Sequence, residues 1–368
     1  MTLVTTFPVR IWQLVWYSLI SLIGTIGNSL VIYLICAAKK SKIDRKAPFN
    51  IYLLVLAIVD LMISLLCVPI YVLSTNIFPH PTGKSGEIMC KTVTGYFFPF
   101  WLLDISAFLL VAIAIERWRV VMKPLTRLKE NKMTWSVMVI FGVLILSFVT
   151  QAPTIYGSHY TTNTPDIGNA CIYSYDNLPM KIMHYNSFVW QTVIPSIIYF
   201  VCFWQIRKRL NQRCSNLDSH LTAYRNSSNY QEKVTLAMKR TKQTVNTMRV
   251  VVIAFLVCVE INQIFFMILK PVLNATDLQW NSHIYQFTVM MRFSNSCINP
   301  ILYGLKSQVF RQRLKQLFPR FCKDFGKTRF WKKRYLFSRR SRKEEQKRRQ
   351  CVVISNGRIT PPLPSNII

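Results

Sequence analysis

The sequence predicts an all-α membrane protein, a seven-transmembrane helix bundle followed by a short amphipathic eighth helix. Its 368 residues are 51% hydrophobic, and the apolar residues gather into about seven long blocks that a soluble domain could not bury. The net charge is +31, and four connecting segments (37–48, 116–132, 207–249 and 306–368) hold 40 of the 46 Lys and Arg residues. Because basic loops stay cytoplasmic, we expect the N-terminus outside the plasma membrane and the C-terminus inside, which requires an odd number of spans.

The chain divides into four parts. These are a short extracellular N-terminus (1–10), the multi-pass domain (11–305), an amphipathic membrane-surface helix (306–319) and a basic cytoplasmic tail (320–368). Of the ten cysteines, only Cys90 and Cys171 lie on the oxidising side in this topology, so we expect one disulfide between them.

The first three spans carry polar groups that apolar surroundings make costly. The first contains Asn28 after Gly27, and the second contains Asp60 in the stretch Leu-Ala-Ile-Val-Asp. An amide in a span needs an interhelical partner, and an ionisable residue there is a functional candidate. The third span begins at Cys90 and closes with Glu116-Arg117-Trp118.

The later segments add prolines and an amphipathic helix. The fifth span contains Pro195, and the seventh contains Asn299-Pro300 with Tyr303 three residues later. Apolar residues then repeat at helical spacing among basic ones, which is typical of a helix lying on a membrane surface; they are Phe310, Leu314, Leu317 and Phe318. Cys322 follows as a palmitoylation candidate, and Asn274-Ala-Thr is a glycosylation candidate in the third external loop.

In this order, these motifs resemble those of the rhodopsin-like (class A) G-protein-coupled receptors, of the orphan or peptide-receptor type. The resemblance covers about residues 11–322 and implies a receptor that couples an extracellular ligand to a heterotrimeric G protein, with arrestin as a further partner. It assigns G-protein coupling to Glu116, Arg117 and Trp118. It assigns the activation switch to five residues, which are Pro195, Phe255, Asn299, Pro300 and Tyr303.

The resemblance also implies a sodium site formed by Asp60, Ser106, Asn295 and Asn299, whose side chains all supply hard oxygen atoms. No organic cofactor and no other metal is expected.

The sixth span departs most from the family pattern. Val259 stands where the family has Trp and Ile261 where it has Pro, and the fourth span lacks the usual Trp. No acid lies between Val234 and Val259 that could pair with Arg117 and hold the receptor inactive. We therefore expect elevated ligand-free signalling, with lost coupling as the rival outcome.

The sequence disfavours two classes of ligand, amines and retinal. Pro99 or Phe97 occupies the position of the acid that amine receptors use, and no Lys for retinal lies between His283 and Leu305. The pocket candidates are Trp101, Asp104, Glu260 and Arg292. A peptide is favoured, while a lipid or other small molecule, or no ligand at all, remains open. Equal depths at 1.5 Å per residue predict that Glu260 pairs with Arg292, with Asp104 as a competitor.

Other function classes fit less well. A membrane transporter predicts internal repeats or paired broken helices, and neither is found. No nucleophile–base or metal-ligand cluster indicates an enzyme. For the basic, aromatic tail, adsorption to anionic inner-leaflet lipids is favoured, a solvated disordered segment is the second interpretation, and binding of nucleic acid or another partner is the third.

Overall fold

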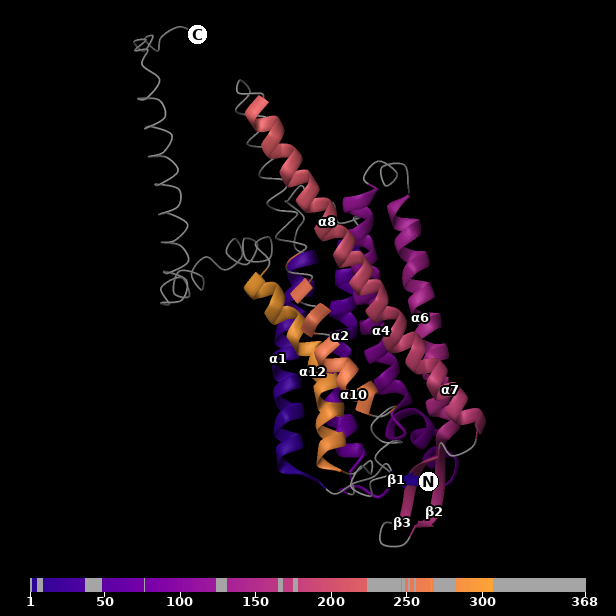
Figure 1. Ribbon diagram of the computed structural model, residues 1–368. Coiled ribbons are helices and arrows are strands. Elements are labelled where there is room, and N and C mark those ends of the chain that lie inside the picture. The colour runs from indigo at the N-terminus through magenta and orange to yellow at the C-terminus, as the bar shows by residue number, and fades with distance from the viewer. Residues whose placement is uncertain are drawn as a thin grey trace, which may run out of the picture. The chain divides into compact units, whose positions relative to one another are not determined.

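The chain is described from a computed structural model (Figure 1). The structure describes residues 2–4, 9–36, 48–75, 77–123, 131–164, 168–174, 178–223, 246, 249–250, 252–254, 256–265, 267 and 282–306. The expected eighth helix, the basic tail, Phe255, Asn274 and Cys322 lie outside these residues.

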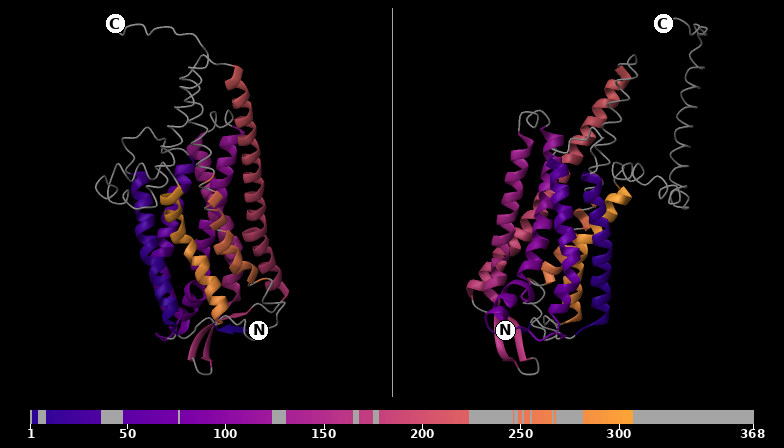
Figure 2. Two further views of the ribbon diagram at one scale, coloured as in Figure 1. Left: turned by 60° about the vertical axis from the view of Figure 1, so that its left-hand side comes forward. Right: turned by 180° about the vertical axis from the view of Figure 1, so that it is seen from behind.

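Among the described residues, six long helices form a bundle (Figures 1 and 2). They are α1 (Ile11–Cys36), α2 (Pro48–Leu73), α4 (Phe97–Met122), α6 (Lys132–Gly157), α8 (Ile194–Ala223) and α12 (His283–Lys306). Short segments extend them: α3 (Gly83–Met89) and the π-helical turn η2 (Cys90–Thr94) precede α4, and α7 (Leu178–Phe188) and η3 (Val189–Val193) precede α8. The described part of the sixth expected span contains η4 (Leu256–Glu260) and α10 (Ile261–Ile264).

Five described helices are long and apolar enough to cross a membrane. They are Ile11–Cys36, Pro48–Leu73, Gly83–Met122, Met133–Gly157 and Leu178–Gln212. In the third of these, 83% of the most apolar window is buried, against 22–44% in the other four. The third expected span is therefore the central helix, packed by α2, α6 and α8, while the others turn apolar side chains outward as a lipid-facing helix does.

A small residue allows close contact between helices α1 and α12. A Cβ atom on Gly27 would lie 2.7 Å from the Cβ of Pro300, so glycine lets α1 approach the proline of α12. Beside it, Asn28 Nδ2 donates to the carbonyl of Ser296 at 2.9 Å, which confirms that this amide finds an interhelical partner.

The third span is interrupted near its first end, where the sequence predicted a continuous helix. Tyr96 has φ 66° and separates η2 from α4. A left-handed backbone conformation is uncommon for a residue other than glycine, and it persists only where the surrounding packing holds it. The tyrosine is buried, and its ring packs against Phe100 at 5.5 Å.

A small antiparallel sheet lies at this end of the bundle, which we call the hairpin end. Strands β2 (Ser158–Thr164) and β3 (Gly168–Ser174) form the hairpin, and β1 (Thr2–Val4) adds to the other edge of β3, giving the order β1–β3–β2. The expected disulfide is confirmed: Cys171 on β3 is bonded to Cys90 on η2, with 5.3 Å between the Cα atoms.

Candidate functional site

A cavity of about 60 Å³ lies beside the sheet, and both apolar and polar side chains line it. Its walls include side chains from seven elements, which are Phe100 of α4, Gln151 of α6, Tyr173 of β3, His184 of α7, Gln191 of η3, Gln263 of α10 and Arg292 of α12. Four amide side chains face it in all, with Asn262 the fourth. Polar groups that converge from several elements are typical of a ligand site.

The charged centre of the site is an ion pair between α4 and α12. Arg292 Nη2 lies 2.5 Å from Asp104 Oδ1, and the two side chains are only 3% and 2% exposed. Gln151 Nε2 donates to the other carboxylate oxygen at 2.5 Å, and Thr154 donates to Gln151 Oε1 at 3.1 Å. The guanidinium also lies over the ring of Phe100, 4.7 Å from its centre. A buried pair held this way is costly to break from one side.

The prediction that Glu260 pairs with Arg292 is wrong, because Arg292 forms its ion pair with Asp104. Depth along a helix follows from residue counting, but the direction of a side chain does not. Glu260 is buried at the end of η4, where Thr192 of η3 and Ser196 of α8 lie near its carboxylate. Neither carboxylate oxygen makes a hydrogen bond of acceptable geometry among the described residues. Glu260 does not line the cavity.

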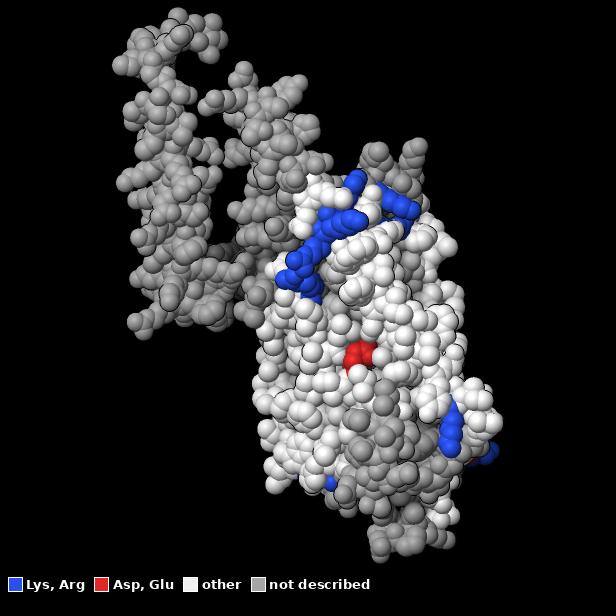
Figure 3. All heavy atoms as spheres, viewed as in Figure 1, with Lys and Arg blue, Asp and Glu red and all other residues white. Residues whose placement is uncertain are grey.

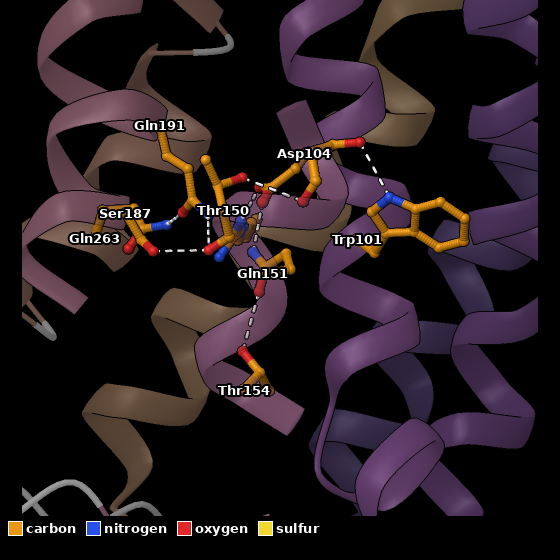
Figure 4. Close-up of polar contacts among 10 residues, drawn as sticks. Trp101, Asp104, Thr150, Gln151, Thr154, Ser187, Gln191 and Gln263 are labelled. Carbon is orange, nitrogen blue, oxygen red and sulfur yellow. Dashed lines mark hydrogen bonds and ion pairs between the residues drawn. The ribbon is translucent and has the colours of Figure 1, made fainter. Parts of the chain in front are cut away.

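Trp101 also lies away from the cavity. Its indole Nε1 donates to Ser147 Oγ of α6 at 3.0 Å, and its ring packs against Phe97 and Phe148. Figure 4 shows Trp101 and Asp104 leaving α4 in different directions. Of the four pocket candidates, therefore, only Arg292 lines the cavity, and Asp104 lies directly behind it.

An amide network forms one wall of the cavity. Gln263 Nε2 donates to Gln191 Oε1 at 2.6 Å, and Gln191 Nε2 donates to the carbonyl of Thr150 at 3.3 Å. Ser187 donates to the same carbonyl at 2.7 Å. Figure 4 shows these side chains pointing toward one another. Sequence reasoning missed them, although an amide inside an apolar span was an available signal.

The sheet is attached to the bundle at several points besides the disulfide. Tyr173 of β3 is hydrogen-bonded to His184 of α7. His80 lies within hydrogen-bond distance of Thr94 Oγ1, at 3.0 Å from Nε2, and stacks on Tyr160 of β2. Burial lowers the pKa of His80 below its ordinary value, so the neutral ring is favoured here. These contacts hold the β2–β3 hairpin beside the cavity, which Tyr173 helps to line.

A second polar cluster lies deeper in the bundle. Asp60 accepts from Ser106 Oγ and from Asn299 Nδ2, both at 2.8 Å. Asn295 Oδ1 and Asn299 Oδ1 are buried and have no hydrogen-bond donor among the described residues. The structure therefore brings together Asp60, Ser106 and Asn299 of the implied sodium site, and Asn295 lies one helical turn before Asn299 on α12. Two buried acceptor oxygens, on Asn295 and Asn299, are left for a hard cation. The donor set fits such an ion.

The Glu116-Arg117-Trp118 triplet lies at the other end of α4. Arg117 Cζ lies 3.3 Å from the ring centre of Phe49 on α2, and Trp118 Nε1 donates to Gln205 Oε1 of α8 at 2.6 Å. Glu116 is buried. The triplet thus contacts both α2 and α8. Pro195 and Pro300 lie within α8 and α12, as predicted.

Comparisons with known proteins agree with this arrangement. A galanin receptor 2b of Danio rerio is 28% identical over 84% of this chain and 76% of its own length. A cholecystokinin receptor type A of Cavia porcellus is 26% identical over 85% and 82%. Squid rhodopsin matches with a TM-score of 0.62 and 20% identity, covering 83% of this chain and 84% of its own, which shows the fold.

The family model of the rhodopsin-family seven-transmembrane receptors matches residues 27–303. This match confirms the expected resemblance and supports a receptor rather than an enzyme. The chain belongs to the rhodopsin family of seven-transmembrane receptors.

Proposed function

We propose that the chain is a peptide receptor of the plasma membrane that activates a heterotrimeric G protein. The observation that supports a peptide ligand is a cavity lined by amide side chains and Arg292, beside the sheet that the disulfide tethers. Amide side chains both donate and accept hydrogen bonds, so they suit the alternating donors and acceptors of a peptide backbone. The similarity to receptors named for galanin and cholecystokinin supports the same class of ligand.

In this proposal the hairpin end faces outward and the C-terminus lies in the cytoplasm. The basic segments support that orientation, because Lys and Arg are retained on the cytoplasmic side. On the face shown in Figure 3, basic side chains gather toward the end opposite the hairpin, and most of the described surface between the ends is uncharged. Arg207, Lys208 and Arg209 of α8 belong to a segment of this kind.

G-protein coupling is assigned to the cytoplasmic end of α4, at Arg117. Its guanidinium is stacked on Phe49, so a change in the contact between α2 and α4 would move the guanidinium that a cytoplasmic partner meets. Arrestin is proposed as a second cytoplasmic partner, and anionic inner-leaflet lipids as a binding surface for the tail.

A sodium ion is proposed beside Asp60. Ser106, Asn295 and Asn299 would hold it together with the carboxylate, and the two acceptor oxygens without a described donor support that assignment. The ion would supply the positive charge that this buried carboxylate otherwise lacks.

Ligand-free signalling is the second candidate. The cavity of about 60 Å³ is well below the ~300–1,000 Å³ of typical small-molecule sites, and Asp104 and Arg292 satisfy each other. Such a receptor could be active without an external ligand. The absence of an acid between Val234 and Val259 supports the same outcome.

The deciding experiment is a G-protein activation assay in cells expressing the full chain, first without ligand and then with a peptide library. We expect an activating peptide whose potency falls about tenfold in Gln191→Ala, because the amide wall loses about one hydrogen bond's worth of free energy. Trp101→Phe is the matched control, since that side chain lies outside the cavity. A basal signal equal to that of untransfected cells, with no active peptide, would reject the proposal.

A further inference from the structure

The edge of the sheet is occupied by the chain's own N-terminus. In β1, Thr2 pairs with Ser174, Leu3 with Tyr173 and Val4 with Ile172. Figure 1 shows β1 beside β3 at the hairpin end. An uncovered strand edge presents unpaired backbone N–H and C=O groups, and it is a template for another extended segment. Here three residues of the receptor itself cover that template.

This strand is held close to its position by a second attachment. Tyr71 of α2 accepts from the backbone N–H of Arg10 at 2.9 Å and donates to its carbonyl at 3.0 Å. Gln13, three residues later, donates to Gln286 of α12 at 3.2 Å. Only residues 5–9 join this anchor to β1, so the strand reaches at most about 20 Å from it. A tether this short holds a segment near its binding edge at an effective concentration of the order of millimolar.

The covered edge and the cavity share one residue. Tyr173, which pairs with Leu3, is also a wall of the cavity and is hydrogen-bonded to His184. An extended segment lying along this edge therefore lies at the mouth of the cavity. In the same cavity, Gln263 donates to Gln191, so two of the lining amides are paired with each other.

We propose that this edge of β3 is a docking edge for an extended peptide ligand and that β1 is a built-in competitor for it. The peptide displaces Thr2–Val4, pairs with Ile172–Ser174 and places its next residues over the cavity. Backbone pairing at a sheet edge is an established mode of peptide recognition, in which main-chain hydrogen bonds give affinity and pockets give specificity. This inference rests on the proposed peptide-receptor function and adds to it the recognition mode and its regulation.

Disulfide trapping tests whether β1 occupies the edge in the membrane. Thr2→Cys with Ser174→Cys places two thiols on directly paired residues, whose Cα atoms lie within the span of a disulfide. The matched control is Val4→Cys with Ser174→Cys, which is two residues out of register and about 8 Å apart. We expect the first pair to cross-link in surface receptor and the second not to. Equal cross-linking of both, or of neither, would overturn the assignment.

A truncated receptor tests whether the edge accepts a strand from another chain. The probe is a labelled synthetic peptide with the sequence of residues 1–8, and the variant lacks residues 1–6 but keeps Arg10 and its anchor. If β1 covers the edge about 90% of the time, the probe should bind the truncated receptor about tenfold more tightly than the full chain. Equal binding to both, or binding to neither, would count against the proposal.

Leu3→Pro in the full chain gives a second measurement of the same effect, which decides the question if the truncated receptor folds poorly. Proline removes a backbone N–H from the pairing strand and leaves the chain length unchanged, and Leu3→Val is its control. We expect Leu3→Pro, but not Leu3→Val, to bind the probe as the truncated receptor does. The reverse order of the two substitutions would overturn the inference.

The peptide-library assay separates this inference from the proposed function. A peptide that activates the full and truncated receptors with equal potency would keep the peptide receptor and reject the docking edge. If no library peptide activates either form, the peptide-receptor function is rejected, while binding of the residue 1–8 probe still decides whether the edge exchanges strands.

Discussion

Removing the carboxylate of Asp104 should destabilise the receptor, because it leaves Arg292 buried without its counter-ion. In Asp104→Asn the 2.5 Å ion pair is lost, and the new amide can accept from only one of its two former donors through its single oxygen. Breaking one side of a buried pair costs about 3–5 kcal/mol. The ring of Phe100 under the guanidinium offsets only part of that loss.

The assay is the temperature at which half of the detergent-solubilised receptor aggregates. A loss of this size corresponds to a decrease of about 5–10 °C. The double variant Asp104→Arg with Arg292→Asp should recover part of it. The exposed Glu87–Lys91 pair is the control, since a surface ion pair contributes little and Glu87→Gln should leave the midpoint unchanged.

Two results would refute this reasoning. Asp104→Asn could aggregate at the parent temperature, which would mean that the pair does not stabilise the bundle. Alternatively, Glu260→Gln could reproduce the loss while Asp104→Asn did not, which would show that Arg292 uses the other acid in the membrane.

The remaining predictions concern coupling, the ion, the disulfide and the covering sheet. Arg117→Ala should reach the cell surface and lose G-protein activation, and normal signalling at matched expression would contradict the coupling role. Asp60→Asn should abolish any effect of replacing sodium by a larger cation on receptor activation, whereas an unchanged sodium response would place the ion elsewhere. Cys90→Ser and Cys171→Ser should each lower surface expression, and the double variant should be no worse than either single one, because they break the same bond. The pKa of His80 is lowered in the folded chain, so its contribution to stability is present above its ordinary pKa of about 6.5. That contribution is lost as the pH falls through the lower pKa of the folded state. The melting midpoints at pH 7 and pH 5 should therefore differ less in His80→Gln than in the parent.

The sequence predicted the parts of the receptor that depend on residue type and order along the chain. A disulfide between Cys90 and Cys171 followed from the topology, and the Asp60 cluster followed from motifs on separate spans that the bundle brings together. An amide, a carboxylate or a proline inside an apolar span restricts its own surroundings so strongly that its presence alone indicates a packed interior position.

The direction of side chains could not be predicted in the same way. Trp101 and Asp104 are three residues apart on α4 and both contact α6, at Ser147 and at Gln151, yet only Asp104 also contacts Arg292 of α12. Which neighbour lies against that face depends on how each helix is rotated about its axis. Rotation is set by the packing of the whole bundle, and residue counting gives only the depth.

The misplacement of Glu260 has a local cause as well. It ends η4, a π-helical turn, and a π turn changes the angle between successive side chains from that of a regular α-helix. Counting at 1.5 Å and 3.6 residues per turn therefore gives an acceptable depth but a wrong direction for the residues near it. Ile261 follows this turn, and the next two residues, Asn262 and Gln263, line the cavity. The departure of this span from the family pattern thus lies at the π turn itself, because Val259 is within the turn and Ile261 directly follows it. At the end of the same turn, Glu260 lies near Thr192 and Ser196 instead of lining the cavity. A substitution that restores a regular α-helix here should reorient Asn262 and Gln263 and also Glu260. The amides that line the cavity and the position of Glu260 therefore depend on the same π-helical turn of the sixth span.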